Sequence, residues 1–525
     1  MRGFAEIRDS SLTLAFLCAI FFLPHIKYIA PCEKRNVKKM WQAENIIFNS
    51  DLSPATVAQI IVDNGKQSQV IKDIRTADRY FDIHNDIEEK TRSYFDKDGK
   101  SIANPAANNA RIKSNFLRMQ VQQKQDYGFA KSFVLKLSTE KQSEIDLAED
   151  AYGLEWKNFL EKILYKMAYR LAGQAVNHGI AWCYVWIDEN GGLNLEDLKG
   201  DLVYPVWKDR QHVDLNSLVY NYFQLEYKSL EPTKTEFAEL WTETEHFKFD
   251  VSDGYKDVPF FADSHSHMTN GVSWEKIPII PLKSTDDEKP LVLFIKDYID
   301  SYDKLISRSI DGLIDDLDPM LVFKGISPNV SDLIEARELA KMTRTISLDS
   351  DGDASYIQAQ TSVDAHLKEL ETLKSDMIKF SYGVDMNDAR FGGNPNQLVI
   401  KSLYQDLDTY TDGIERHFQS FIEQLKYFFD KWYEITGRGS FAEAQEYKIL
   451  VKLDRSMLIN QSSLIDDTVK LQGTGVSQKT LLEFNPVVQD VELEQKRLED
   501  EKAENDIFSL DSEPDKKQDS DGKEV

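Results

Sequence analysis

Cysteine is scarce in this sequence, and acidic residues outnumber basic ones. The three cysteines, Cys18, Cys32 and Cys183, give neither a disulfide framework nor a close pair of zinc ligands, so we expect folding in the cytosol. The 89 acidic and 63 basic residues give a net charge of −26 and a pI near 4.9. Because phosphate binding requires basic surface, this balance argues against a protein that grips nucleic acid, and it permits a surface that DNA passes without adhering.

Signatures of catalysis are also lacking, as are apolar runs long enough to cross a membrane. The sequence contains no nucleophile elbow, Walker loop, HExxH motif or CxxC pair, so we expect neither an enzyme nor a cofactor. The apolar run at residues 12–23 is shorter than the roughly 20 residues of a transmembrane helix. Arg2 and Arg8 precede it. Residues 1–39 are therefore a secretory signal, an interfacial anchor or, as we favour, an extension upstream of a true start at Met40.

The remaining composition is that of a globular protein with a large core. Hydrophobic residues make up 41% of the chain and aromatic residues 11%, and the length allows about three or four packing units. Helical and strand patterns are mixed, which predicts an α+β fold. The predicted helices cover residues 53–94 and 159–179, and the predicted strands cover residues 180–188, 202–209 and 218–227.

Three long amphipathic helices are predicted, at residues 291–318, 363–381 and 398–436. Each carries apolar residues at steps of three and four, and the first carries aspartates on its other faces. The first stripe is Ile295, Ile299, Tyr302, Ile306, Ile310, Leu313 and Leu317; the second is Val363, Leu367, Leu370, Leu373, Met377 and Phe380; the third is Ile400, Leu403, Leu407, Tyr410, Ile414, Phe418, Phe421, Leu425, Phe428 and Trp432. Such helices are predicted to be rigid struts.

Between the second and third helices lies a long loop, residues 382–397. Gly383, Gly392, Gly393 and Pro395 exclude regular structure there. Loops of this length between two helices are uncommon and are either functional or disordered.

Two short patterns suggest metal binding but lack the necessary partners. His265 and His267 would share one face of a strand, yet no acidic residue or cysteine at a convincing distance completes a site. Asp349, Asp351 and Asp353 have the spacing of a calcium loop, but Gln360 stands where the closing glutamate should be. We therefore predict a loop and a hairpin turn, followed by a strand at residues 354–358.

Three stretches resemble one known family. These are DYIDSYDKLISRSIDGLIDDLDPMLVFKG at residues 297–325, IKFSYGVDMNDARFGGNPNQLVIKSLYQDLD at residues 378–408, and GIAWCYVWIDENGG at residues 179–192. A fourth, weaker match is Asn108–Phe116 against the pattern N-N-R-I-x-x-N-F. Together they resemble the portal proteins of tailed phages, in the branch found in siphophages of Gram-positive bacteria. One departure is Pro395-Asn396-Gln397, where relatives often have Ser-Gly, and it leaves the start of the third helix uncertain.

The resemblance implies a portal fold with a mixed α/β wing, a helical stem, a small α/β clip, a long tunnel-lining helix and a helical crown. The implied division is an N-terminal extension (1–39), wing (40–290), first stem helix (291–318), clip (319–362), second stem helix (363–381), tunnel loop (382–397), long wing helix (398–436), crown (437–498) and a disordered acidic tail (499–525).

The resemblance also implies candidate site residues. The DNA-facing tunnel loop would present Asn387, Asp388, Arg390, Phe391, Gly392, Gly393 and Asn394. The stem motif comprises Asp300, Tyr302, Asp303, Ser307 and Asp311. Partner docking on the clip would involve Arg337, Arg344 and Asp351.

The implied function is a ring, typically of twelve subunits, at one capsid vertex, through which double-stranded DNA passes during packaging and ejection. The implied partners are the terminase large subunit, head-completion and neck proteins, the scaffold protein and the major capsid protein. Assembly in the host cytoplasm, a final place in the virion and no stable membrane association follow from the same resemblance. The residues leave two alternatives: a metal-dependent hydrolase using His265 and His267, and a secreted or membrane-anchored binding protein.

Overall fold

The computed structural model describes most of residues 52–501. Undescribed positions within that span are 96–99, 104–107, 140–146, 148–149, 228–231, 259–264, 269–270, 318–319, 325–352, 358–362, 393–395, 456–460, 486–487, 489–490 and 492–493. The predictions for residues 1–39, for Arg337, Arg344 and Asp351, for Gly393 and Asn394, and for most of the acidic tail lie outside the described residues.

The first described helices are α2 (Pro54–Gln67) and α3 (Gln69–Phe81). The Ser53 side chain accepts a hydrogen bond from the Thr56 N–H, which caps the N-terminus of α2 as its sequence predicts. Ser68 caps α3 in the same way and divides the two helices. The prediction of helix as far as residue 94 is wrong, because the chain leaves the helix at Asp82 and forms only a 3-10 turn, Asp86–Glu89.

A second helical run combines α5 (Ala151–Phe159), one π turn (Leu160–Leu164) and α6 (Tyr165–His178). It packs beside α4 (Phe116–Phe129). The run ends where predicted, at Gly179, which has a φ of 86°. A Cβ there would lie 2.1 Å from the carbonyl oxygen of Glu288, so only glycine fits.

Two antiparallel sheets follow the helices. The strand predicted from residue 180 is β4 (Ile180–Ile187), which pairs with β5 (Leu193–Leu198) and β11 (Ile279–Lys283). The second sheet has the order β10-β9-β8-β7-β6. Its strands are β6 (Val203–Trp207), β7 (Leu215–Tyr227), β8 (Pro232–Trp241), β9 (His246–Asp250) and β10 (Lys256–Asp257).

The main core forms around α10 (Gln397–Ile435), a helix of 39 residues. Its predicted stripe is buried from Ile414 to Trp432, and Trp156 of α5 stacks on Phe429 with ring centroids 4.1 Å apart. The turn α11 (Phe441–Ala444) and strand β14 (Lys448–Lys452) also belong to this core, since β14 pairs with β3 (Val134–Ser138). Residues 441–453 therefore pack into the same core as α10.

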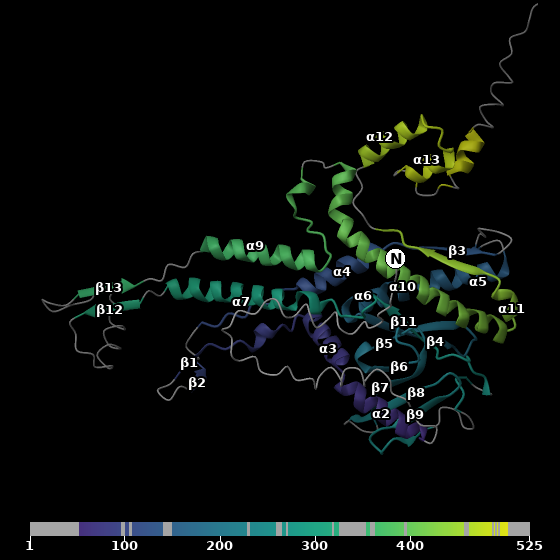
Figure 1. Ribbon diagram of the computed structural model, residues 1–525, viewed down its shortest axis with the longest axis horizontal. Helices are drawn as coiled ribbons and strands as arrows, with labels where there is room; N and C mark the ends of the chain where they lie inside the picture. Colours follow the sequence, from purple (N-terminus) through teal and green to yellow (C-terminus); the bar gives the residue numbers. More distant parts are fainter. Residues whose placement is uncertain are drawn as a thin grey trace, which may run out of the picture.

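A pair of antiparallel helices projects from the body (Figure 1). They are α7 (Val292–Leu317) and α9 (Val363–Phe380), and they touch through Tyr298 with Phe380 and Ser309 with His366. The hairpin of β12 (Met320–Lys324) and β13 (Asp353–Ile357) lies at the far end, and the short hairpin of β1 (Ser93–Phe95) and β2 (Ser101–Ala103) lies near the pair. Helices α12 (Gln461–Gln472) and α13 (Gln478–Phe484) form a separate layer beyond α10.

Candidate functional site

One face of α7 binds an extended segment of the same chain, residues 108–114. Asp311 accepts a hydrogen bond from the Ala110 N–H at 2.7 Å, Ser307 accepts one from the Ile112 N–H at 2.9 Å, and Asp303 accepts one from the Ser114 N–H at 2.9 Å. All three helix side chains are buried. We call these three bonds the polar ladder.

The bonds of the polar ladder can form because the spacing of helix residues four apart nearly matches the spacing of alternate residues in an extended chain. Positions four apart on a helix are separated by about 6 Å along its axis, and alternate residues of an extended chain by about 6.6 Å. Side chains at i, i+4 and i+8 of α7 therefore meet every second N–H of the segment, which runs antiparallel to the helix. Successive residues of an α-helix are rotated by about 100° around its axis. Tyr298 and Ser309, which contact α9, therefore lie on the side of α7 opposite to the polar ladder, and α7 is held between α9 and residues 108–114.

Charged groups extend the ladder at both ends. Lys296 donates to Asp86 and to Asp300, both at 2.6 Å, and the Tyr80 hydroxyl donates to Asp300 at 2.5 Å. At the outer end Lys90 donates to Asp311 at 2.7 Å. Burial alone would raise the pKa of Asp86, but hydrogen bonds from Lys296 and Arg79 lower it to about 2.

The sequence places the aspartates of this helix on faces other than its apolar stripe. In the structure Asp300, Asp303 and Asp311 are buried there against other segments of the same chain, whereas Asp297 is exposed. Burial raises the pKa of Asp303, opposed by hydrogen bonds from Asn85 and Ser114. Tyr302 packs edge-on against Phe116 with centroids 5.0 Å apart. In this chain the motif fastens α7 to the segments before α4.

The described part of the long loop carries its own ion pair. Asp388 accepts from the Arg390 guanidinium at 2.7 Å and from the Arg390 N–H at 2.8 Å, which lowers the pKa of the carboxyl to about 2. The Arg390 side chain is exposed, but it is already paired with Asp388 within the loop. Phe391 lies edge-on to Tyr404 of α10, with centroids 6.2 Å apart. The Asn387 N–H donates to the Asp385 carboxylate at 3.0 Å.

The start of α10 is well defined despite the unusual Pro395-Asn396-Gln397 sequence. The Asn396 side chain accepts a hydrogen bond from the Val399 N–H at 2.9 Å. Asparagine is among the preferred N-cap residues, so Asn396 begins the helix at the place where relatives often have Ser-Gly. Gly392 has an extended backbone, with φ −73° and ψ 155°, which residues other than glycine also adopt.

The paired histidines contact different partners in the fold. His267 Nε2 lies 3.0 Å from the carbonyl oxygen of Thr242, and His265 pairs with Asp257 at 3.4 Å. Burial lowers the pKa of His267 to about 4. Across the described residues, no group of three or more His, Cys, Asp or Glu side chains is arranged to hold a metal ion.

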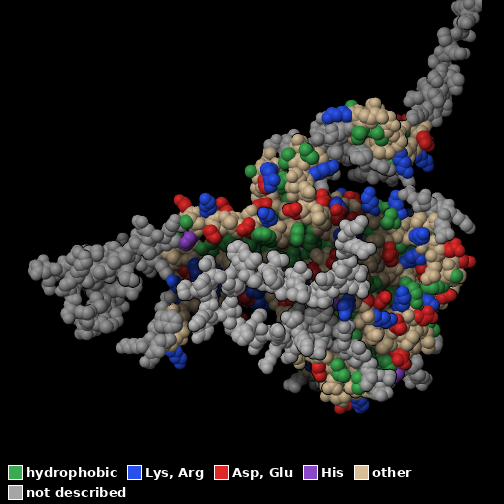
Figure 2. Space-filling model, viewed as in Figure 1, with side chains coloured by type: hydrophobic (Ala, Val, Ile, Leu, Met, Phe, Trp, Pro, Cys, Tyr) green, Lys and Arg blue, Asp and Glu red, His purple; other side chains and the backbone are tan. Residues whose placement is uncertain are grey.

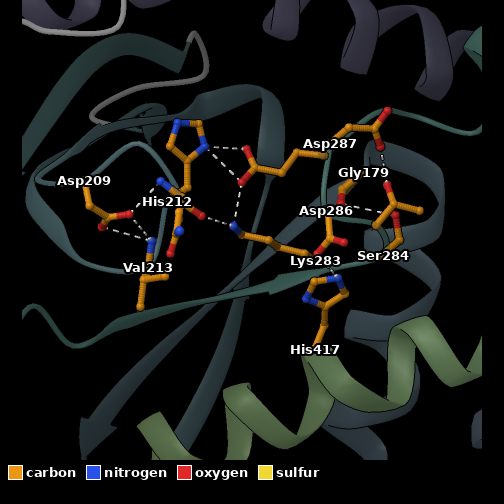
Figure 3. A network of polar contacts seen from close by, with 12 residues as sticks. Gly179, Asp209, His212, Val213, Lys283, Ser284, Asp286, Asp287 and His417 are labelled. Atoms are coloured by element: carbon orange, nitrogen blue, oxygen red, sulfur yellow. Dashed lines mark hydrogen bonds and ion pairs between the residues drawn. The ribbon is translucent and has the colours of Figure 1, made fainter. Parts of the chain in front are cut away.

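A further polar network fastens the turn after β6 to the turn after β11 (Figure 3). His212 and Lys283 each lie 2.8 Å from the Glu288 carboxylate, and the His212 ring stacks on Trp207. His212 and Glu288 have φ values of 57° and 53°, which are costly for residues other than glycine. The Glu288 carboxylate is thus paired within this network, to which we assign a structural role.

Sequence reasoning missed two features of this site. One is the partner of segment 108–114: the segment matches the family pattern, but its hydrogen bonds to α7, about 200 residues away in the sequence, were not predicted. The other is the row Gln120, Gln123 and Lys124 of α4, which contacts the end of α9. Their only signal is that polar residues interrupt the apolar pattern of α4. No helix within the described residues has the length and apolar character needed to cross a bilayer.

The projecting helix pair and the long loop between α9 and α10 are features that the resemblance to phage portal proteins led us to expect. The family described as "Phage portal protein, SPP1 Gp6-like" matches residues 62–507, and the chain belongs to this family. It is therefore a phage portal protein and a virion component.

Two relatives are similar over most of their length. The portal protein of Bacillus phage SPP1 is 26% identical over 455 residues, covering 85% of this chain and 86% of the relative. The portal protein of Clostridium phage phiCD119 is 24% identical over 477 residues, covering 86% of this chain and 97% of the relative. The hydrolase and secreted-protein alternatives find no support in these matches.

Proposed function

We propose that copies of this chain, twelve by analogy, form a ring at one capsid vertex and that double-stranded DNA passes through its centre during packaging and ejection. The observation that carries this proposal is the projecting pair α7 and α9, which leads directly into the long loop before α10 (Figure 1). Rods packed side by side around an axis would form the channel wall, and the loops would point toward the opening.

Exposed apolar side chains on the projecting pair support an assembly of several copies. Leu313 is 45% exposed and Leu367 is 53% exposed, although both belong to the predicted apolar stripes. Figure 2 shows hydrophobic side chains gathered along this part of the molecule. Heterologous ring interfaces would bury such surface between neighbouring copies.

The proposed division follows the resemblance with one change. The wing comprises the body through residue 290 together with α10, α11 and β14; the stem comprises α7 and α9; the clip comprises residues 319–362; and the crown begins only after residue 455. This later start is supported by the pairing of β14 with β3.

The burial of the α7 carboxylates affects the charge that the channel would present to DNA. Asp300, Asp303 and Asp311 are buried, so the negative charge facing DNA would come from other residues of this acidic chain. Arg390 is paired with Asp388, so the loop would offer little free positive charge to phosphates. The scarcity of free positive charge on the loop favours DNA that slides without being held. Arg390 and Asn394 remain our proposed points of contact with the DNA backbone. The loop positions that we propose face DNA are Asn387, Asp388, Arg390, Phe391, Gly392, Gly393 and Asn394.

The proposed partners are those of a packaging vertex. The clip, through Arg337, Arg344 and Asp351, would dock the terminase large subunit and later the neck proteins. The scaffold and major capsid proteins would surround the ring during assembly in the host cytoplasm.

Negative-stain electron microscopy of the purified full chain tests the ring. We expect ring-shaped particles with a central hole, and light scattering should give a mass many times 60.5 kDa. A stable monomer at high protein concentration would contradict the proposal.

Gly392→Val tests the loop. The φ and ψ of Gly392 are ones that a β-branched residue adopts. A Cβ would make one tight contact, 3.2 Å from the carbonyl oxygen of Ala389, which a small shift of this exposed loop relieves, so the fold should persist while the loop stiffens. We expect rings of normal appearance and reduced DNA packaging, measured as DNase-protected DNA per particle. Normal packaging would count against the placement of the loop in the channel.

A further inference from the structure

Helix α4 contacts the chain where α9 gives way to the long loop. The Gln123 side-chain amide donates to the Val384 carbonyl oxygen at 2.8 Å and accepts from the Val384 N–H at 2.9 Å. One side chain thus satisfies both backbone groups of one loop residue, as a neighbouring β-strand would.

Gln120, one turn earlier on α4, makes the second contact. Its Oε1 accepts from the Ser381 hydroxyl at 2.8 Å and lies 3.4 Å from Lys124 Nζ. Gln120, Lys124 and Ser381 are all buried. A Cβ on Gly383 would lie 2.0 Å from the same Oε1, so glycine at this position is what allows the close approach.

The backbone at this point is strained and held from two sides. Tyr382 has a φ of 58°, in the left-handed position that usually carries glycine at the end of a helix, and the Gly383 N–H bonds the Ile378 carbonyl oxygen at 2.8 Å. The Tyr382 ring stacks on Tyr410 of α10 with centroids 5.6 Å apart. A strained turn persists only when surrounding contacts fix it.

The same helix also contacts the far end of the loop. The Tyr127 hydroxyl donates to Asp408 of α10 at 2.5 Å, and its ring stacks on Tyr404. Tyr127, Val384, Ile400, Tyr404 and Leu407 form one buried apolar cluster. Helix α4 therefore bridges the end of α9 and the beginning of α10.

We propose that Gln120 and Gln123 form a clamp that fixes the entry of the loop, so that loop movement is confined to the residues beyond Val384. Gln123 is then a positioning residue for the portal channel, acting through the backbone of Val384 without touching DNA. This inference rests on the proposed channel role of residues 382–397.

Hydrogen exchange of the assembled full-length protein tests the clamp, with Gln123→Ala as the variant. The matched control is Gln125→Ala, because Gln125 lies on the same helix and also donates one amide hydrogen bond, to the Tyr169 carbonyl oxygen at 2.8 Å. We expect exchange at Val384 and across residues 385–392 to rise about tenfold in Gln123→Ala alone, since two backbone bonds lose their partner. Ring formation should match the control, whereas the melting temperature should be lower than in the control, because Gln123→Ala leaves both backbone groups of Val384 without their partner.

Gln123→Glu gives an intermediate case. A glutamate can still accept a hydrogen bond from the Val384 N–H but cannot donate one to the Val384 carbonyl oxygen. We therefore expect an exchange rate between those of the wild type and Gln123→Ala. If Gln123→Ala does not assemble, Gln123→Glu tests the clamp in its place. Equal exchange in the position-123 variants and the Gln125→Ala control would overturn the clamp. Faster exchange with normal packaging would support the clamp and refute only the role of the loop in DNA passage.

Discussion

At the residue scale, the buried carboxylates of α7 explain why its polar positions are so regularly spaced. Asp303 receives the Ser114 N–H at 2.9 Å and the Asn85 side-chain amide at 2.6 Å, and its side chain is fully buried. Each donor would otherwise be desolvated without a partner, which costs more than an average hydrogen bond contributes.

Asp303→Ala should therefore lower the free energy of unfolding by about 2 to 4 kcal/mol, because two buried donors lose their acceptor. The measurement is the urea midpoint, together with hydrogen exchange at Ser114. Asp297→Ala, at an exposed position of the same helix, is the control and should change stability by less than about 0.5 kcal/mol. Equal midpoints for the two variants would argue against the ladder.

Lys124 illustrates a residue whose burial opposes stability. It is almost fully buried, its nearest polar partners are atoms of Gln120, and burial lowers its pKa from 10.5 to about 7. Between these two pKa values the unfolded chain binds more protons than the folded chain, so the contribution of this group to stability rises with pH.

Lys124→Met should stabilise the protein at pH 6.5, and the gain should shrink at pH 9.5, because the cost of burying the amine is present in full only below its folded-state pKa. Urea midpoints at the two pH values measure this. Lys166→Met, on an exposed position of α6, is the matched control. A pH-independent gain would mean that better packing, and not the charge, is responsible.

At the element scale, helices of this protein repeatedly serve as partners for extended chain. On α10, the Gln419 amide donates to the Ile449 carbonyl oxygen at 2.9 Å and accepts from the Val451 N–H at 2.8 Å, and Glu415 accepts from the Leu453 N–H at 3.0 Å. These residues are spaced by four on the helix and by two on the strand, as in the polar ladder. Polar side chains thus cover the edge of β14.

Arg455 ends this arrangement. Its guanidinium contacts Asp408, Asp412 and Glu415 of α10, three acidic side chains on one helix face. Burial alone would lower the pKa of Arg455, but these acidic partners raise it above its usual value.

Arg455→Ala should destabilise the protein by about 1 to 2 kcal/mol, discounted because the group is partly exposed, and 0.5 M NaCl should reduce the loss by screening the remaining acidic residues. Thermal unfolding at low and high salt measures this, with Arg416→Ala on the exposed face of α10 as control. A loss that is unchanged by salt would show that packing dominates.

At the scale of the whole molecule, the projecting helix pair lacks a complete core of its own. Ile295 and Ile299 are fully buried near the body, whereas Leu313 and Leu367, farther out, are exposed. An amphipathic helix whose apolar stripe is exposed in the single chain is typical of a surface that another copy covers.

Leu313→Lys combined with Leu367→Lys should reduce ring formation severalfold and leave the melting temperature of the monomer nearly unchanged, because both side chains are already exposed in the single chain. Size-exclusion chromatography with light scattering measures assembly. Leu154→Lys on α5, at a position 49% exposed, is the control and should assemble normally. Normal rings from the double variant would place the subunit contacts elsewhere.

The sequence by itself determined several of the elements, and it determined the family. Apolar periodicity predicted α7, α9 and α10 nearly to their ends, β-branched and aromatic enrichment predicted β4, and Ser53 predicted the cap of α2. These features depend on neighbours within a few residues, so the local pattern carries them. The motifs quoted above also sufficed to identify a portal protein.

Only the tertiary structure decided which polar residues are buried. Periodicity places Asp303 and Ser307 away from the apolar stripe, but it gives no information about a covering segment; that segment pairs with α7 across about 200 residues of sequence. Likewise, nothing local to Gln123 indicates that it binds Val384, 261 residues away. The physical reason is that a polar side chain tolerates burial only where a distant backbone group satisfies it, and chain topology alone brings the two together.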